Sequence, residues 1–276
     1  MRRYLVLFLC SVFIITLSGC TAKKEDKVEL QVFIAASLNT VMADLAKAYQ
    51  KDHPEVMIVY NADSSGKLLT QIEEGYECDI FFSAAQKQMD QLEQDGLVVE
   101  GTRKDVLNNQ LVVIAGKSSN TKVTGLENLG DATSLALADG SVPAGKYTRQ
   151  ALMKLGILPE SEDVSKISTQ EVSTALGEVE ISEQGNVSKV LISVVEGSCE
   201  VGTTYYSDTY GYEEKVDILQ KVSYELTGDI IYPVCLVKNK EATSAKEKAA
   251  EDFYQFILSD TAKAIFEQYC FETKVN

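Results

Sequence analysis

The sequence predicts an α/β protein whose mostly parallel sheets are flanked by helices. Three consecutive units each begin with an apolar, strand-like run and continue into a segment with apolar residues at helical spacing. The strand-like runs cover residues 30–34, 56–60 and 78–83. A crossover through a helix usually pairs its two strands in parallel, so three such units in a row indicate a twisted parallel sheet.

The first two of these helices begin at short polar turns that contain serine. The turns are Ala35-Ala36-Ser37-Leu38 and Asp63-Ser64-Ser65-Gly66. The first N–H groups of a helix have no carbonyl partner within the helix, and they bind anions readily. A single serine before a helix is usually only an N-cap. Two such turns at strand ends, where α/β proteins bind ligands, instead indicate a site for a small anion.

The chain continues with further strands and a third helix start. Apolar runs at 111–115 and 135–138 are typical of strands. The segment Val142-Pro143-Ala144-Gly145 then leads into a helix that closes at Gly156. Proline is favoured in the first helical turn because its missing N–H would be unpaired there in any case. This turn is therefore a third candidate anion-binding helix start.

The second half of the chain alternates less regularly. Residues 160–185 are polar, and we treat them as an insertion of uncertain structure. Asn186-Val187 opens a clearer helix, and a strand is expected at 201–206. Another strand is expected at 230–237, where Pro233 indicates an edge strand or a segment that crosses between domains. Two amphipathic helices complete the chain.

The N-terminus is typical of an exported lipoprotein. Arg2 and Arg3 precede a short apolar run, and the small residues before Cys20 resemble a lipobox. We therefore expect a signal peptide at 1–19, acylation of Cys20 rather than a free thiol there, and a polar tether at 20–27. The apolar run is too short for a stable transmembrane anchor.

The processed chain would be strongly acidic. Removal of residues 1–19 takes away two arginines and leaves 24 basic and 41 acidic residues, a formal charge of −17 over 257 residues. This charge argues against a nucleic-acid partner. The length, with 45% hydrophobic residues, suffices for one large domain or two small ones, and we prefer two.

Cysteine and histidine provide no evident metal site. The cysteines that remain are Cys78, Cys199, Cys235 and Cys270, without a CxxC motif or metal-type spacing, and we predict no particular disulfide. The only histidine, His53, precedes a proline at an expected helix end, where a surface position is typical. We therefore expect no metal or cofactor bound directly by side chains.

Five segments together resemble a known family. They lie at 35–38, 64–66, 79–84, 142–147 and 232–234. Their order and spacing resemble the molybdate-binding proteins of bacterial ABC importers, which are two-lobed solute-binding proteins of the periplasmic-binding-protein type. The resemblance covers nearly the whole processed chain. It implies a ligand cleft between two lobes, each a mostly parallel sheet flanked by helices.

The resemblance also implies the lobe boundaries and the ligand-binding residues. The first lobe would comprise 28–111 and a return segment at 231–276, and the second lobe would comprise 112–230. A hinge would lie near 111–114 and 232–234. The oxyanion would be held by the hydroxyls of Ser37, Ser65 and Tyr205 and by the backbone N–H groups of Ala144 and Val187.

One position in this assignment has an alternative, and a neighbouring position departs from the family pattern. Val172 offers an alternative register for Val187, but counting back from 202–205 reaches Val187 without a gap. Tyr206 stands where the family resemblance suggests a small residue. Ser83, in another strand-to-helix turn, is a further candidate contact.

The proposed contacts suit molybdate, which is a dianion without a proton at neutral pH. It only accepts hydrogen bonds, and each of the five groups can donate one. Tungstate is expected to bind as well. Sulfate has the same charge and shape but is smaller, whereas phosphate keeps a proton and would need an acceptor such as Asp63.

Other functions remain open at this stage. Ferric iron would use phenolates such as Tyr205 and Tyr206, although successive strand residues point to opposite faces. A serine-dependent enzyme would need a base beside Ser37 or Ser65, and neither motif supplies one. A purely structural lipoprotein would bind no ligand. We expect a non-enzymatic, monomeric binding protein on the outer face of the cell membrane, with an ABC permease as its partner.

Overall fold

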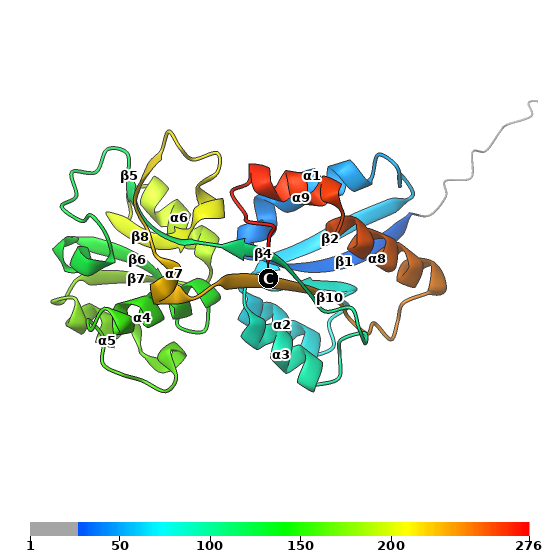
Figure 1. The fold of residues 1–276 in the computed structure, drawn as a ribbon, viewed down its shortest axis with the longest axis horizontal. Helices are drawn as coiled ribbons and strands as arrows, with labels where there is room; N and C mark the ends of the chain where they lie inside the picture. Colours follow the sequence, from blue (N-terminus) through cyan, green and yellow to red (C-terminus); the bar gives the residue numbers. More distant parts are fainter. Residues whose placement is uncertain (1–26, 276) are drawn as a thin grey trace, which may run out of the picture.

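The computed structural model describes residues 27–275, and the signal peptide at 1–19, Cys20 and nearly all of the tether lie outside the described residues. Two lobes lie side by side, each with a five-stranded sheet between helices (Figure 1). The predicted α/β fold with two lobes is confirmed. The described residues contain no helix long and apolar enough to span a membrane.

The first sheet has the strand order β2-β1-β3-β10-β4. Its strands are β1 (Val28–Ala35), β2 (Val56–Asp63), β3 (Ile80–Phe82), β4 (Lys104–Asn109) and β10 (Ile230–Leu236). Its helices are α1 (Asn39–Tyr49), α2 (Ser65–Glu73), α3 (Gln86–Gln94), α8 (Ser244–Ile257) and α9 (Asp260–Gln268), with the 3₁₀ turn η1 (Ala36–Leu38) before α1.

The second sheet has the strand order β7-β6-β8-β5-β9. Its strands are β5 (Leu111–Gly116), β6 (Ser134–Ala138), β7 (Glu180–Gln184), β8 (Val201–Tyr205) and β9 (Val216–Lys221). Its helices are α4 (Pro143–Lys154), α5 (Thr169–Ala175), α6 (Val187–Val195) and α7 (Tyr224–Thr227), with 3₁₀ turns η2 (Leu126–Asp131), η3 (Val164–Lys166) and η4 (Tyr206–Thr209).

Both sheets are mixed in the same way. The pairs β1–β2 and β1–β3 are parallel, as the strand-helix units predict, and so are β6–β7 and β6–β8. The remaining pairs are antiparallel. Each antiparallel pair includes β5 or β10, the strands that follow the two crossings between the lobes. The sequence shows no strand-helix unit at these crossings.

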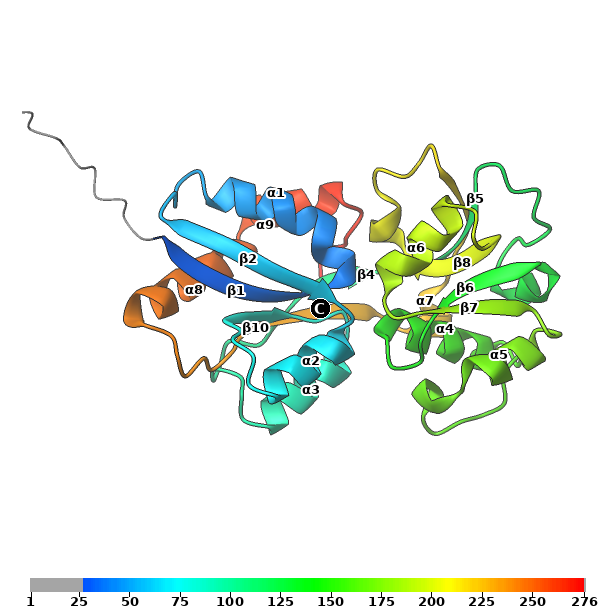
Figure 2. The ribbon, with the colours of Figure 1, turned by 180° about the vertical axis from the view of Figure 1, so that it is seen from behind.

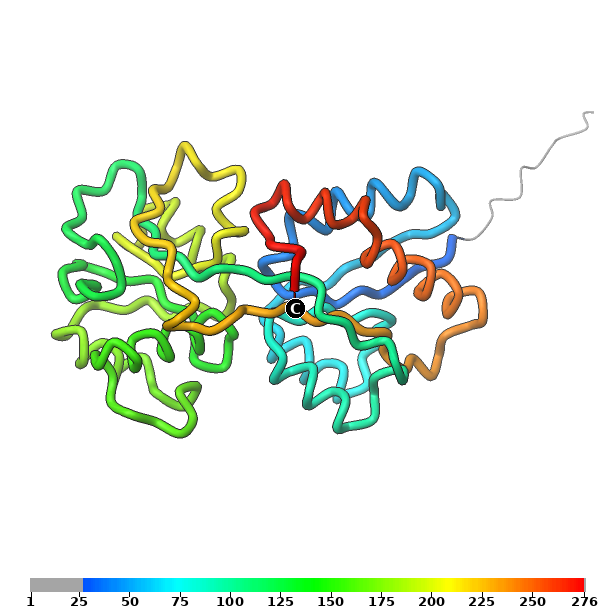
Figure 3. The backbone as a smooth tube through the Cα atoms, in the orientation of Figure 1, coloured from blue at the N-terminus to red at the C-terminus, as the bar shows by residue number. Residues whose placement is uncertain are grey.

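The chain passes twice between the sheets, at Gln110 and just before β10 (Figure 3). Pro233 lies in β10, between β3 and β4, so the strand is a crossing segment but not an edge strand. The register shifts between Tyr232 and Pro233, and such a bulge accommodates a residue that has no N–H. The lobe bounds that we predict, 28–111 with 231–276 and 112–230, stay a prediction.

The segment 160–185 is regular, contrary to its appearance as an uncertain insertion. It contains η3, α5 and the strand β7, which lies at the edge of the second sheet. The sequence analysis missed this strand because Ile181 is its one apolar side chain, so the strand shows no apolar alternation. The helix α5 begins with a capping box made by Ser168 and Glu171.

A fully buried arginine fixes this segment to the second lobe. The Arg149 guanidinium donates to the carbonyls of Ile167, at 2.7 Å, and Ala138, at 2.9 Å. It also donates to the Thr169 hydroxyl at 3.2 Å. Burial lowers the pKa of Arg149, and no carboxylate in the described part of the chain forms an ion pair with it. Backbone carbonyls stabilise its charge, and the nearby carboxylates of Asp139 and Glu183 counteract the effect of burial on its pKa.

The helix α4 approaches β6 so closely that only glycine fits at position 145, in the first turn of the helix. A Cβ atom on Gly145 would lie 2.1 Å from the Asp139 carbonyl oxygen and 2.4 Å from that of Ala138. At Gly66, in the first turn of α2, the nearest atom would be 3.5 Å away.

We predict that Gly145→Ala lowers the free energy of unfolding by roughly 1–3 kcal/mol, since the backbone must shift to admit the methyl group. Gly66→Ala is the matched control and should leave stability unchanged or slightly raised, because alanine favours helices. Urea denaturation followed by circular dichroism measures both. Equal stability of the two variants would contradict the packing argument.

Candidate functional site

A small cavity lies between the two lobes, where strand ends meet helix starts. In Figure 2 the strands β1 and β2 run toward the second lobe, whose helices α4 and α6 face them. The cavity is small, with a volume of about 10 Å³. It is lined by all five predicted site residues, Ser37, Ser65, Ala144, Val187 and Tyr205, together with Ala35, Ala36, Asp63, Ser64, Ala84, Val142 and Pro143.

Ser37 lies inside the 3₁₀ turn η1 rather than at an N-cap. Its side chain is buried, and its Oγ lies 2.8 Å from the Tyr232 hydroxyl oxygen. The turn connects β1 directly to α1, so the hydroxyl is held at the carboxyl end of a central strand.

Ser65 is the first residue of α2, and its hydroxyl oxygen accepts a hydrogen bond from the Ala84 N–H at 2.9 Å. The acceptor side of Ser65 is thus occupied, and its own proton remains available to the cavity. Ser83 does not line the cavity, because its hydroxyl donates to the Ala85 carbonyl at 2.8 Å. Its neighbour Ala84 lines the cavity instead.

Ala144 and Val187 bring backbone donors from the second lobe. They are the second residue of α4 and the first residue of α6, so their N–H groups have no carbonyl partner within the helix. Val172, the rival for Val187, is fully buried in α5 and does not line the cavity. The structure thus brings Val187, and not Val172, to the other four residues.

Tyr205 ends β8 with a hydroxyl that lacks a partner. Its side chain is 1% exposed, and its oxygen has no hydrogen-bond partner among the described residues. Burial raises the pKa of Tyr205 well above its usual value, so the phenol keeps its proton. An unpaired buried hydroxyl costs about 1–3 kcal/mol, which favours a ligand that accepts from it.

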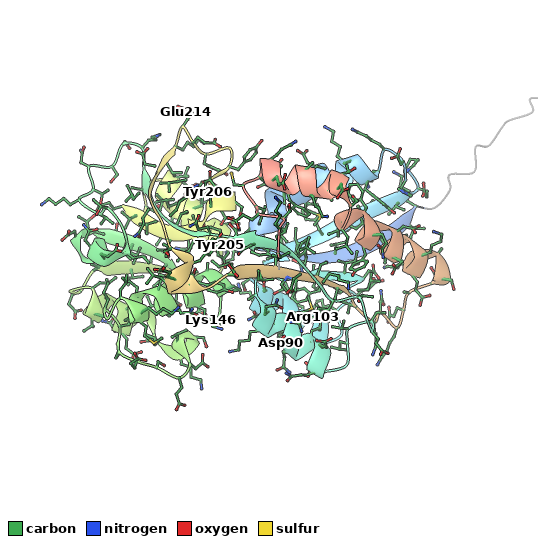
Figure 4. The ribbon with its side chains drawn as sticks, in the orientation of Figure 1. Asp90, Arg103, Lys146, Tyr205, Tyr206 and Glu214 are labelled. Carbon is green, nitrogen blue, oxygen red and sulfur yellow. The ribbon has the colours of Figure 1, made fainter. Side chains whose placement is uncertain are left out.

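Tyr206 does not join Tyr205 in the cavity. Both are labelled in Figure 4, and Tyr206 lies in η4, with the Lys221 ammonium 3.3 Å from its ring centroid. The alternation expected for successive strand residues does not apply here, because β8 ends at Tyr205; the turn η4 instead keeps Tyr206 out of the cavity lining.

The cavity lining contains no lysine or arginine, and its one acid is already engaged. The Asp63 carboxylate accepts from the Ser64 N–H at 2.8 Å and from the Asn186 amide at 3.1 Å, and Lys67 lies 3.6 Å away. The Asn186 bond and a second one, from the Ser188 hydroxyl to the Ala36 carbonyl at 3.2 Å, connect the lobes. The lobes are thus in contact around the cavity.

Sequence reasoning missed two groups behind the site. Tyr232, in β10, contacts Ser37, and Asn109, at the end of β4, contacts Tyr232 at 3.0 Å. Both side chains are buried. The available signal was a polar side chain within an apolar strand, since Tyr232 lies in the run Ile-Ile-Tyr-Pro-Val-Cys-Leu.

Asp208 is a second acid near the site, half-buried beside Tyr205. It accepts from the Thr204 hydroxyl at 2.9 Å and from the Tyr205 N–H at 3.1 Å. Burial outweighs these bonds and raises the pKa of Asp208 to about 6.

Chemically, the site is a set of neutral donors without a base. Neither serine has a carboxylate or imidazole partner, and no group of three or more His, Cys, Asp or Glu side chains within residues 27–275 is arranged to hold a metal ion. Such a site is suited to binding a fully deprotonated anion.

Comparisons with known proteins find similar chains over nearly the whole sequence. Residues 30–272 match the family described as bacterial extracellular solute-binding protein. The molybdate-binding protein ModA of Escherichia coli is 30% identical over 99% of both chains. A provisionally named ABC transporter substrate-binding lipoprotein of Bacillus subtilis, YvgL, is 29% identical over 98% of both.

A solved structure adds to this likeness. The substrate-binding domain of a provisionally assigned molybdenum ABC transporter from Clostridium difficile is 32% identical. It superposes with a TM-score of 0.64, and the match covers 91% of this chain and 100% of that one.

We predict a pH-dependent stability difference between the wild type and Asp208→Asn. The folded pKa of about 6 lies above the unfolded value near 3.8, so the folded state loses stability as the pH rises from about 4 to above 6. The variant lacks this loss. At pH 8 it should be more stable than the wild type by an amount on the order of 3 kcal/mol at most, and the difference should shrink toward pH 4.

Chemical denaturation between pH 4 and 8 measures this difference. Asp52→Asn, at an exposed position, serves as the control and should show no such trend. A difference between Asp208→Asn and the wild type that stays constant over this range would refute the assignment.

Proposed function

The chain belongs to the bacterial extracellular solute-binding protein family, and from this premise we propose that it captures molybdate, and also tungstate, for an ABC importer. The protein would hold the anion between its lobes outside the cell membrane and deliver it to the permease. The observation that carries the proposal is the convergence of donors from both lobes on one cavity, including the unpartnered Tyr205 hydroxyl. The names of the E. coli and C. difficile relatives support the choice of ligand.

The donor set favours an anion that has no proton. The hydroxyls of Ser37, Ser65 and Tyr205 and the N–H groups of Ala144 and Val187 can each donate to a separate region of a tetrahedral dianion. Neutral donors at helix N-termini stabilise such an ion without a cation, and each charge-assisted bond contributes roughly 1.5–3 kcal/mol. The net charge of the chain slows the encounter but does not prevent the complex.

Phosphate and sulfate fit the site less well, for different reasons. Hydrogen phosphate needs an acceptor, and the one acid in the lining, Asp63, would have to supply it through Oδ2, because Ser64 and Asn186 both bond to Oδ1. Sulfate makes the same demands as molybdate but is smaller, so only the size of the closed cavity discriminates between them.

Iron binding and catalysis find little support in the site. Tyr206 does not line the cavity, and neither serine has a general base as a hydrogen-bond partner. We therefore propose that the protein is a monomeric binding protein, without a cofactor and without enzymatic activity.

We predict that Ser37→Ala and Ser65→Ala each weaken molybdate binding by roughly 10- to 100-fold, because each removes a bond to a charged acceptor. Ser83→Ala is the matched control, since it removes a buried serine hydroxyl that lies outside the cavity. It should bind like the wild type.

A thermal-shift panel of molybdate, tungstate, sulfate, phosphate and ferric citrate tests the ligand class. At 100 times its dissociation constant, a ligand should stabilise the folded state by about 2.7 kcal/mol. Isothermal titration then gives the affinities of the variants. If neither molybdate nor tungstate raised the unfolding temperature, the proposal would be refuted.

We also propose that Cys20 is acylated and anchors the protein to the outer face of the membrane. The name of the B. subtilis relative includes the word lipoprotein, which supports this. Cys20→Ala should move the protein from the membrane fraction to the medium, as measured by fractionation and immunoblotting. Retention of the variant in the membrane would contradict acylation at this residue.

A further inference from the structure

A continuous line of buried hydrogen bonds leads from the second lobe to Ser37. The Asn109 amide nitrogen lies 2.8 Å from the Ser207 hydroxyl in η4 and 3.0 Å from the Tyr232 hydroxyl. The Tyr232 hydroxyl in turn lies 2.8 Å from Ser37 Oγ. These four side chains are at most 6% exposed, so water does not substitute for any of the bonds.

The direction of this line follows from the amide of Asn109. Its Oδ1 accepts from the Gln110 N–H at 2.8 Å, which identifies the group that faces Tyr232 as the Nδ2 amide. An amide NH₂ group only donates, so the Tyr232 oxygen accepts from it. Burial raises the pKa of Tyr232 well above its usual value, and the phenol therefore still has a proton to give.

Among the described residues, Ser37 is the one hydrogen-bond partner of Tyr232 that can accept its proton. Ser37 Oγ then accepts from Tyr232, and the Ser37 proton is left for the cavity. Ser65 reaches the same condition by another route, because the Ala84 N–H occupies its acceptor side. Both serines thus receive a hydrogen bond from behind and offer their own proton in front.

We propose that Asn109 and Tyr232 are positioning residues that set the direction of the hydrogen bond at Ser37, so that Ser37 donates to the bound anion. The proposal rests on the proposed function, since it concerns how the same site selects a fully deprotonated oxyanion. If the direction were reversed, Ser37 would donate to Tyr232 and present a lone pair to the dianion. The site would then repel its ligand at one of its five contacts.

Asn109→Asp tests the direction because it replaces the donor by a carboxylate of the same shape. The carboxylate draws the Tyr232 proton, and Tyr232 then accepts from Ser37. We expect molybdate binding to weaken by roughly 10- to 100-fold, the range for a lost bond to a charged acceptor. Asn109→Ala, which removes the donor without adding a charge, should give a smaller loss.

The decisive variants combine each of these changes with Tyr232→Phe. Without the phenol oxygen nothing captures the Ser37 proton, so each double variant should bind molybdate more tightly than its Asn109 single variant. We expect Tyr232→Phe alone to weaken binding less than Asn109→Asp does, since Ser37 loses the bond that orients its hydroxyl but keeps a proton to donate. Tyr254→Phe is the matched control, because its hydroxyl donates to the Thr102 carbonyl away from the cavity.

Isothermal titration with molybdate measures all variants, after thermal denaturation has confirmed that each is folded. Double variants that bind as weakly as the Asn109 single variants, or more weakly, would overturn the proposal in favour of a purely structural role. An Asn109→Asp variant that binds molybdate like the wild type would overturn the proposal as well. A wild-type chain that binds neither molybdate nor tungstate would instead refute the proposed function.

Discussion

The arrangement of the site depends on one constraint: an anion enclosed between two lobes must find donors that are already oriented and have no competing partner. Helix starts meet this constraint with N–H groups, as at Ala144 and Val187. Among the hydroxyls, that of Ser65 meets it because the Ala84 N–H occupies one of its acceptor positions, and that of Tyr205 because it has no partner among the described residues. The close packing of Gly145 against β6 belongs to the same requirement, because it brings the α4 start to the cavity.

Both lobes place their donors in the same way, although they share little sequence. In each, the two parallel pairs bring the carboxyl ends of strands to the interlobe face, and a helix begins directly after the strand end. The antiparallel strands β4, β5 and β10 provide the continuous backbone between the lobes (Figure 3). Ligand contacts and lobe connections thus come from different parts of each sheet.

Much of this could be predicted from the sequence, because apolar periodicity and serine-bearing turns are local signals. The fold and the residues that line the cavity follow from them and from the family resemblance. The edge strand β7 could not be predicted, since only Ile181 of its side chains packs against the core. Tyr232 and Asn109 escaped for another reason: their role depends on contacts between residues more than a hundred positions apart, which no local pattern reports.

The position of β10 also affects how the protein is made. The second sheet consists of one continuous stretch, from β5 to β9, whereas the first sheet needs β10 between β3 and β4. During synthesis and export from the N-terminus, β3 and β4 therefore emerge with unpaired edges and wait for more than a hundred residues. The second lobe can complete its sheet meanwhile, whereas the unpaired edges of β3 and β4 stay open to wrong pairing until β10 arrives.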